Sequence, residues 1–287
     1  MNMNDFFAGQ VFNAYEYFGS HKESGRIVFR TFAPNAANVC IFGSFNNWSE
    51  EPMTQESYGV YSFVSDSANF GDMYKYVIYT KSGERFEHCD PYGFGMELRP
   101  QWASYIVDLS EYKFTDDKWL ECRNKNYNSP MNIYEVHLGS WLNNPQNENG
   151  WYNYSEIADK LIEYAKKHKY THLEFLPLSE HPADCSWGYQ NTGFFSPTSR
   201  YGTAAQLMEL VDKCHKNNIG VIMDFVPVHF AVDGYGLAQY DGSYLYEYPP
   251  SDVGISEWGT CNFNHSRNEI GRASCRERGV RSGVGGG

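Results

Sequence analysis

The sequence predicts an N-terminal immunoglobulin-like β-sandwich followed by the first part of a parallel (β/α)8 barrel, about three βα units. Residues 26–109 carry short runs of alternating β-branched and aromatic residues separated by turn residues, which is typical of a sandwich. Beyond residue 131, apolar runs of strand length alternate with segments of helical spacing, which is typical of parallel βα units. We therefore expect a sandwich at 1–115, a linker at 116–130 and the partial barrel at 131–268.

Five segments predict the strands of the sandwich. Each is rich in β-branched and aromatic residues and is bounded by turn residues. They are residues 26–32, 38–42, 58–64, 73–79 and 104–109. The polar, charged stretch at 113–130 separates them from the second part and predicts a connector.

In the second part, apolar runs at 132–139, 171–178 and 219–226 predict three strands, and the segments between them have helical spacing. Thr203 and Gln206 predict a capping box at the start of the second helix. A doubly wound sheet begins in the same way as a barrel. Two features favour the barrel: the first strand lacks a Gly-rich fingerprint, and polar and aromatic residues follow the second and third strands.

The composition limits the classes of partner. The net charge of −12 argues against nucleic acid and anionic membranes as partners. Aromatic residues make up 17% of the chain, which fits a carbohydrate-binding protein but also an aromatic-rich sheet. The start of the chain has no basic, apolar leader, and no apolar run is long enough for a membrane helix. The seven Cys are scattered, so we expect reduced thiols in a cytoplasmic protein, with neither disulfides nor a zinc site.

Three side chains at the predicted strand ends are candidates for a binding site. Asp224 lies in the third predicted strand, His229 follows Pro227 beyond it, and Tyr189 follows the second strand. Each has a structural alternative: Asp224 could cap a turn, His229 could be a satisfied loop histidine, and Tyr189 could pack at the rim. Because they lie on successive βα loops, we expect them at one face of the barrel. Trp187 and Gln190 flank Tyr189 and are included in the site.

Trp48 closes an apparent hairpin in the first part. It either presents a flat ring to a ligand or belongs to the core of the sandwich. Cys214-His215 lies on a predicted helix and indicates no metal pair. No Walker-type phosphate loop and no Gly-x-Ser-x-Gly nucleophile motif occurs.

Together these motifs resemble the glycogen (1,4-α-glucan) branching enzymes of glycoside hydrolase family 13. The matching segments of the second part are 134–141, 176–182, 186–190, 224–229 and 245–248. Upstream, the segments 32–36, 43–48, 74–76 and 90–92 resemble a family-48 carbohydrate-binding module. Asp-x4-His alone would indicate only the wider amylase group, whereas the Glu-His-Pro and Trp-Gly-Tyr-Gln motifs narrow the resemblance.

The resemblance implies an enzyme that moves an α-1,4 glucan segment to an α-1,6 position by a retaining mechanism. It also implies that the enzyme needs neither a nucleotide cofactor nor a catalytic metal. It implies that Tyr189 stacks on the bound sugar, that His229 binds the sugar's 6-hydroxyl and that Asp224 supports the polar network. The nucleophile, the acid/base residue and the transition-state stabiliser follow later strands of the family, so none is assigned here. We therefore expect this chain to be inactive alone. The alternatives are a trehalohydrolase or debranching hydrolase of the same family, and a glucan-binding protein without catalysis.

Residues 269–287 are rich in Gly and Arg, lack apolar periodicity and resemble the translation of a sequencing adapter. We expect this tail to be non-native and exclude it from the fold. We also expect an open strand edge to make the partial barrel prone to aggregation. On that reasoning, a chain ending at residue 115 would be more soluble than one ending at residue 268.

Overall fold

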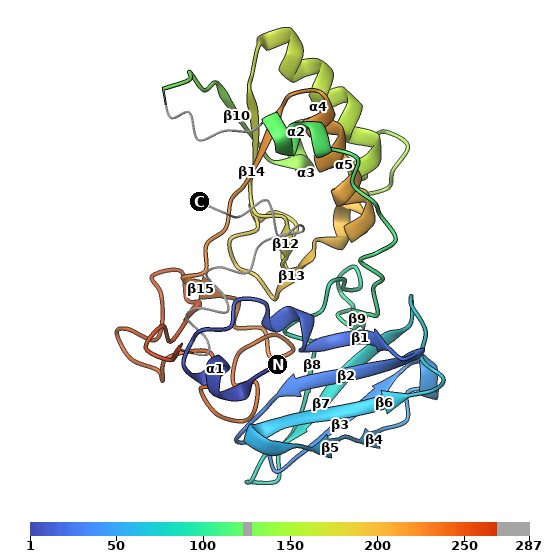
Figure 1. The fold of residues 1–287 in the computed structure, drawn as a ribbon. Coiled ribbons are helices and arrows are strands. Elements are labelled where there is room, and N and C mark those ends of the chain that lie inside the picture. Colours follow the sequence, from blue (N-terminus) through green and yellow to red (C-terminus); the bar gives the residue numbers. More distant parts are fainter. Residues whose placement is uncertain (123–127, 269–287) are drawn as a thin grey trace.

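The computed structural model describes residues 1–122 and 128–268 (Figure 1). A β-sandwich forms one end of the molecule and an α/β part forms the other. One sheet has the order β1 (Gly19–Glu23), β2 (Arg26–Phe32), β6 (Val60–Ser65), β5 (Thr54–Gln55). The other has the order β4 (Glu51–Pro52), β3 (Asn38–Gly43), β7 (Met73–Tyr79), β8 (Arg85–His88), with β9 (Ser104–Tyr105) also paired to β7. All these pairs are antiparallel, and the predicted sandwich is confirmed.

The two sheets meet through aromatic and aliphatic side chains. Phe29 of β2 lies with its ring 4.9 Å from that of Tyr74 of β7, in an edge-to-face arrangement. Short helical turns close the sandwich: α1 (Met3–Phe7), η1 (Ala14–Glu16), η2 (Ser44–Asn46) and η3 (Ser57–Gly59). Phe6 of α1 is buried against Phe18 and Phe32, so the N-terminal helix covers one end of the core.

The α/β part is built on a parallel sheet of β10 (Ile133–Val136), β11 (His172–Phe175) and β14 (Gly220–Met223), in that order. The helices α4 (Tyr154–His168) and α5 (Ala204–Lys216) connect these strands and pack side by side. Thr203 and Gln206 form the predicted capping box of α5, and Asn153 and Glu156 form another at α4. The strand–helix alternation confirms the predicted first part of a barrel.

Shorter elements complete this part: α2 (Asp117–Cys122), α3 (Leu138–Trp141), η4 (Ser199–Tyr201), the hairpin β12 (Ser179–Glu180) and β13 (Gly193–Pro197), and the pair β15 (His229–Phe230) and β16 (Cys261–Asn262). Helix α2 lies in the segment predicted as a linker. It is held on α5 by Trp119, whose ring stacks on that of His215 at 4.9 Å and 11°.

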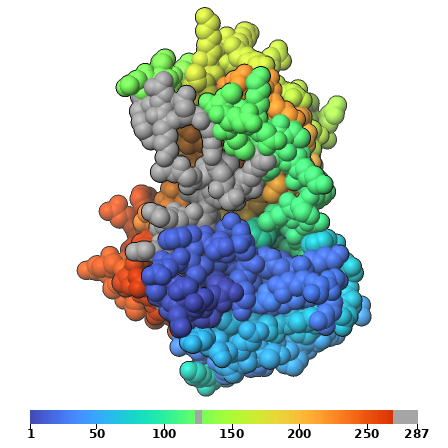
Figure 2. Space-filling model, viewed as in Figure 1, coloured from blue at the N-terminus to red at the C-terminus, as the bar shows by residue number. Residues whose placement is uncertain are grey.

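The core of the sandwich continues into the segment that follows β14. Phe230, Leu237, Tyr240 and Phe263 are buried in the same apolar cluster as the sandwich residues, at most 5% exposed. In Figures 1 and 2 this orange-to-red segment lies directly beside α1. A second cluster fills the space between the parallel sheet and helices α4 and α5. The sandwich therefore shares its core with residues beyond the barrel strands.

Candidate functional site

The carboxyl ends of the parallel strands carry the predicted polar residues. The sequence predicts a third strand that runs to residue 226 and contains Asp224, but β14 ends at Met223. Asp224 is the next residue, and its backbone N–H donates to the carbonyl oxygen of Phe175, 2.9 Å away, at the end of β11. This last bond holds the Asp224 carboxylate just beyond the strand ends, the place where barrel sites gather.

Tyr189 and Asp224 contact each other directly. The phenol of Tyr189 donates to Oδ2 of Asp224 at 2.5 Å. Burial, followed by the Asp224 carboxylate and the more distant carboxylates of Glu135 and Glu174, raises the pKa of Tyr189 to about 12. The phenol thus keeps its proton at neutral pH and positions its ring through this charge-assisted hydrogen bond.

The loop before Tyr189 depends on Gly188. Its φ of +90° is in the region that favours glycine, and an added Cβ would lie 2.6 Å from the carbonyl oxygen of Pro177. The Gly188 carbonyl accepts a hydrogen bond of 2.9 Å from Nδ2 of Asn191, and its N–H donates to Oγ of Ser186 at 3.0 Å. These contacts fix the backbone that directs the Tyr189 ring.

His229 lies near the Tyr189 loop, but in a strand and not in the loop that the sequence predicts. The sequence predicts a loop residue outside any strand, whereas His229 begins β15, pairs with Asn262 of β16 and is 6% exposed. Its Nδ1 lies 2.9 Å from Oγ1 of Thr260, and burial lowers its pKa, which favours the neutral imidazole. Among the described residues, no hydrogen bond joins it to Tyr189 or Asp224.

The loops of Tyr189 and His229 are nevertheless joined. The N–H of Ala231 donates to the carbonyl oxygen of Asn191 at 3.0 Å. Ala231 lies two residues after His229, and Asn191 lies two residues after Tyr189. Trp187 is 65% exposed, and Gln190 is half-buried. The structure therefore brings Tyr189 and Asp224 into contact, ties the His229 strand to the same loop, and leaves the Trp187 ring free on the surface.

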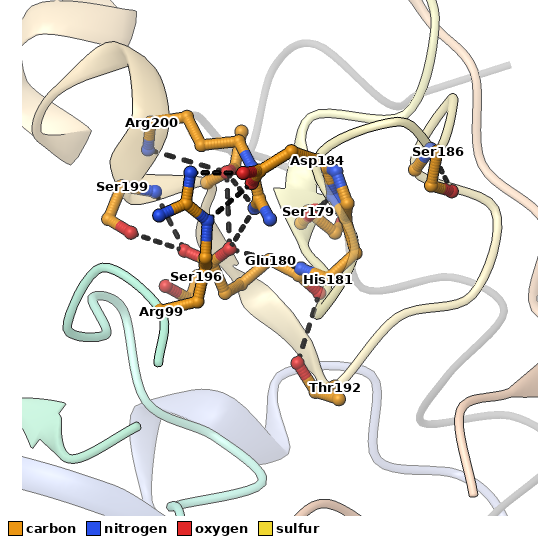
Figure 3. A network of polar contacts seen from close by, with 12 residues as sticks. Arg99, Ser179, Glu180, His181, Asp184, Ser186, Thr192, Ser196, Ser199 and Arg200 are labelled. Atoms are coloured by element: carbon orange, nitrogen blue, oxygen red, sulfur yellow. Dashed lines mark hydrogen bonds and ion pairs between the residues drawn. The ribbon is translucent and has the colours of Figure 1, made fainter. Parts of the chain in front are cut away.

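A buried ionic network supports this loop and was not predicted from the sequence (Figure 3). Glu180 of β12 accepts 2.7 Å hydrogen bonds from Nη1 of Arg200 and from the backbone N–H and Oγ of Ser199. The Arg200 and Glu180 side chains are 1% and 5% exposed. Nε of Arg200 and Nε of Arg99 both donate to Oδ1 of Asp184, at 2.8 and 2.6 Å. Arg99 comes from the sandwich part, so the network joins both parts through Asp184, which lies in the segment that leads from β12 to Tyr189.

Two family models match the chain. "Carbohydrate-binding module 48 (Isoamylase N-terminal domain)" matches residues 17–93, and "Alpha amylase, catalytic domain" matches residues 142–244. The chain is also 46% identical over 272 residues to a 1,4-alpha-glucan branching enzyme GlgB of Fusobacterium nucleatum, covering 92% of this chain and 44% of that protein. In its two parts the chain is therefore similar to a carbohydrate-binding module and to the catalytic domain of α-amylases, and over most of its length it is similar to branching enzymes.

Other branching enzymes of the family are similarly close. The GlgB of Francisella tularensis subsp. tularensis is 46% identical over 280 residues, covering 92% of this chain and 43% of that protein. That of Gloeobacter violaceus is 42% identical over 276 residues, covering 92% of this chain and 38% of that protein. The chain thus spans less than half the length of these relatives.

Solved structures share the fold at lower identity. A pullulanase from Paenibacillus barengoltzii in complex with maltohexaose and α-cyclodextrin has a TM-score of 0.70 at 19% identity, covering 93% of this chain and 48% of that one. A putative α-amylase from Salmonella typhimurium has a TM-score of 0.68 at 20% identity, covering 89% of this chain and 40% of that one. These likenesses support the fold, a sandwich followed by part of a barrel.

Within the matched carbohydrate-binding module, Trp48 lies on the surface. Its side chain is 41% exposed and packs edge-to-face on Phe42 at 5.5 Å, so the alternative of a core tryptophan is wrong. Nζ of Lys75 lies 5.9 Å from the Trp48 ring and 3.5 Å from that of Trp102. Trp102 in turn stacks on Tyr235 at 5.2 Å and 17°. The sandwich therefore also carries an exposed aromatic surface.

The described residues contain no group of three or more His, Cys, Asp or Glu that could hold a metal ion. In the same ranges, no helix is long and apolar enough to cross a membrane. Cys214 is buried in α5, and the neighbouring His215 pairs with Asp116, its Nδ1 2.8 Å from Oδ2. The expected non-native tail at 269–287 lies outside the described residues.

Proposed function

We propose that these residues belong to a 1,4-α-glucan branching enzyme and form the part of its site that binds the sugar next to the cleaved bond. The contact between Tyr189 and Asp224 at the ends of β11 and β14 carries this proposal. The identity of 42–46% to branching enzymes supports it further. The substrate is an α-1,4-linked glucan such as amylose or growing glycogen.

The geometry suggests a role for each side chain. The Tyr189 ring offers a flat apolar face to a pyranose, and the hydrogen bond to Asp224 prevents the ring from turning away. Nδ1 of His229 is engaged by Thr260, which leaves Nε2 for the 6-hydroxyl of the sugar. Trp187 and Gln190 extend the same loop toward neighbouring glucose units.

Catalysis itself requires groups that we do not assign to this chain. A retaining transfer uses a carboxylate nucleophile and an acid/base residue about 5–5.5 Å apart. By resemblance, the residues assigned here would hold and orient the glucan while those groups form and resolve the glucosyl–enzyme intermediate. We propose that this chain alone binds glucan without transferring it.

The surface at Trp48 is part of the same proposal. An exposed tryptophan beside an ammonium group suits a carbohydrate, because the ring stacks on a sugar face and Nζ of Lys75 donates to hydroxyls. We propose that it retains a distant part of the polymer. The net charge of −12 disfavours nucleic acid as a partner. Because the chain is 46% identical to bacterial 1,4-α-glucan branching enzymes, we propose a cytoplasmic protein that acts on glycogen.

Binding is tested on this chain by isothermal titration with maltoheptaose. Tyr189→Ala should abolish measurable binding in the α/β part, whereas Tyr189→Phe should weaken it only moderately because the ring remains. Trp48→Ala should reduce retention in a glycogen-containing native gel without changing the contribution of Tyr189. Unchanged affinity in Tyr189→Ala would contradict the proposed site.

The reaction is tested on the complete product of the source gene. Incubation with amylose should create new α-1,6 linkages, visible by proton NMR, without a matching rise in reducing ends. A rise in reducing ends, or a loss of α-1,6 linkages from glycogen, would instead indicate a hydrolase of the family. The low identity of 19% to the pullulanase makes that second candidate weaker.

A further inference from the structure

An exposed tryptophan beside His229 has no role in the site described so far. Trp258 is 70% exposed, although burial of its large ring would be favourable. It lies in a tight turn in which the N–H of Ser256 donates to the carbonyl of Thr260 at 2.9 Å, and the N–H of Gly259 donates to that of Ser256 at 3.0 Å. Oγ of Ser256 also accepts the N–H of Trp258 at 3.2 Å. The backbone that presents the indole is therefore well fixed.

The same turn is fastened to His229. Oγ1 of Thr260 contacts both Nδ1 of His229, at 2.9 Å, and Oγ of Ser256. Strand β16 begins at the next residue, Cys261, which pairs with Phe230 of β15. As a result, the indole of Trp258 lies over the imidazole of His229, with centroids 5.6 Å apart and planes inclined by 31°.

This placement sets a flat, solvent-exposed ring next to the sugar-binding groups. His229 is 6% exposed, so the indole forms the outer surface at this point. The groups that hold the turn are two hydroxyls and an imidazole, without a carboxylate or an ammonium group in these contacts. A large exposed ring held in place by hydroxyl groups and an imidazole suits a neutral ligand with flat apolar faces and many hydroxyls, such as a glucan chain.

We propose that Trp258 is a second sugar-stacking platform, which holds a glucose unit beside the one that contacts Tyr189 and His229. This inference rests on the proposed function, because it places Trp258 along the same bound glucan. The loops that carry these residues are joined by the 3.0 Å bond from the N–H of Ala231 to the carbonyl of Asn191. A single oligosaccharide lying across that junction would contact both platforms.

The competing role for Trp258 is packing against another part of the protein. Val253 and Ile255 of the same segment are 60% and 44% exposed, so the indole could belong to an apolar contact surface. The two roles differ in what the side chain does in this chain alone. A platform contributes to maltoheptaose affinity, whereas a packing residue does not.

The experiment is a set of isothermal titrations of this chain with maltoheptaose, combined with thermal unfolding of each variant. Trp258→Ala should weaken binding about tenfold, the equivalent of one stacked ring, while Trp258→Phe should retain most of the affinity. Val253→Ala, a truncation of an exposed apolar residue five positions earlier, should bind as the unaltered chain does. Equal melting temperatures would show that the loss in Trp258→Ala is not unfolding.

The outcomes separate this inference from the proposed function. Normal affinity in Trp258→Ala together with lost affinity in Tyr189→Ala would overturn the platform and leave the proposed function standing. Lost affinity in both alanine variants, with Trp258→Phe close to the unaltered chain, would support both. An unaltered chain that fails to bind maltoheptaose at all would overturn both.

Discussion

The hydroxyl of Tyr240 lies 2.7 Å from Oγ1 of Thr31, and both side chains are fully buried, at 0% and 1% exposure. The two residues are 209 positions apart in the chain, one in strand β2 and the other in the segment that follows β14. Next to them, the N–H and Nδ2 of Asn35 donate to Oδ2 of Asp241 at 2.9 and 3.0 Å. Polar groups are thus paired across an apolar contact, which fixes one arrangement of the sandwich on the segment after β14.

A double-mutant cycle measures this contact. Tyr240→Phe leaves the Thr31 hydroxyl buried without its partner, so we expect the free energy of unfolding to fall by about 1–3 kcal/mol. Thr31→Val should have a similar effect, and the double variant should be less destabilised than the sum of the two. Urea unfolding followed by fluorescence gives the three values. Strict additivity would contradict a direct bond between the hydroxyls.

The shared core reverses an expectation about solubility. The prediction that a chain ending at residue 115 is the more soluble one requires a sandwich with a core of its own. In the structure, Phe230, Tyr240 and Phe263 belong to that core, so ending the chain at 115 would expose the apolar surface that they cover. We expect the 1–115 chain to aggregate and the 1–268 chain to remain in the supernatant. Sedimentation after expression of both lengths tests this prediction. A soluble, cooperatively unfolding 1–115 chain would support the original expectation that the shorter chain is the more soluble one.

The local pattern of the sequence predicted the longest strands, β2, β3, β6 and β7, because apolar alternation reflects burial on one face. The segment 73–79 coincides with β7 and 26–32 with β2. Strand β1 was missed, since Ser20-His21-Lys22-Glu23 lacks such a pattern; it is an edge strand paired only with β2. The third barrel strand was predicted too long, because the apolar residues after Met223 turn into the loop that leads to the sandwich.

Contacts between segments that are distant in the chain could not be predicted from the local sequence pattern. Glu180 and Arg200 are 20 positions apart and are buried together, yet each alone has the pattern of an ordinary surface residue. The pairing of Tyr189 with Asp224 was expected only in so far as successive strand ends meet at one edge of a parallel sheet. The setting of His229 in β15 depends on its partner β16, which no feature of the segment 224–229 indicates.

His88 should make stability depend on pH. Its Nδ1–H donates to the carbonyl of Gly236 at 2.9 Å, its Nε2 is buried without a partner among the described residues, and burial lowers its pKa to about 4. Between pH 6.5 and 4, His88 is protonated in the unfolded chain but neutral in the folded protein. The free energy of unfolding therefore decreases as the pH falls through this window. We expect this residue to contribute a loss of up to about 3 kcal/mol by pH 4.

The comparison that isolates this effect is His88→Asn. The asparagine amide can still donate to the Gly236 carbonyl but does not titrate, so its unfolding free energy should fall less steeply with acid than that of the unaltered chain. Taking the difference between the two proteins at pH 7, 5.5 and 4 removes contributions common to both, such as the buried carboxyl of Asp90, whose pKa burial raises. Parallel curves would show that His88 takes up its proton equally in the folded and unfolded states, which would contradict the lowered pKa.

The Glu180–Arg200 pair should be far more sensitive than the surface ion pairs. Arg200→Met leaves the Glu180 carboxylate buried with only Ser199, Thr198 and backbone donors, and we expect a loss of about 3–5 kcal/mol. Lys213→Met, which removes solvent-accessible ion pairs to Asp159 at 3.3 Å and to Glu209 at 3.1 Å, should change stability by less than about 1 kcal/mol. Thermal unfolding of both variants tests this. Similar melting temperatures would mean that the Glu180 network is replaceable.

A single methyl group at Gly188 should disrupt the glucan site. In Gly188→Ala the added Cβ would meet the Pro177 carbonyl at 2.6 Å while the backbone holds a φ of +90°, so the loop must shift and carry Tyr189 away from Asp224. Gly71 provides the matched control, because its φ is +91° and nothing lies within 4 Å of its would-be Cβ. Gly71→Ala therefore carries only the cost of the backbone conformation, about 1 kcal/mol.

We expect Gly188→Ala to lose maltoheptaose binding in isothermal titration and to return the Tyr189 phenol from a pKa of about 12 toward its ordinary value, observed by ultraviolet difference titration against Tyr189→Phe. Gly71→Ala should bind as the unaltered chain does. The mechanism requires both changes to appear together, because the same displacement removes the hydrogen bond to Asp224 and the sugar contact. Lost binding with an unshifted phenol pKa would mean that Gly188 acts on the sugar directly and not through Tyr189.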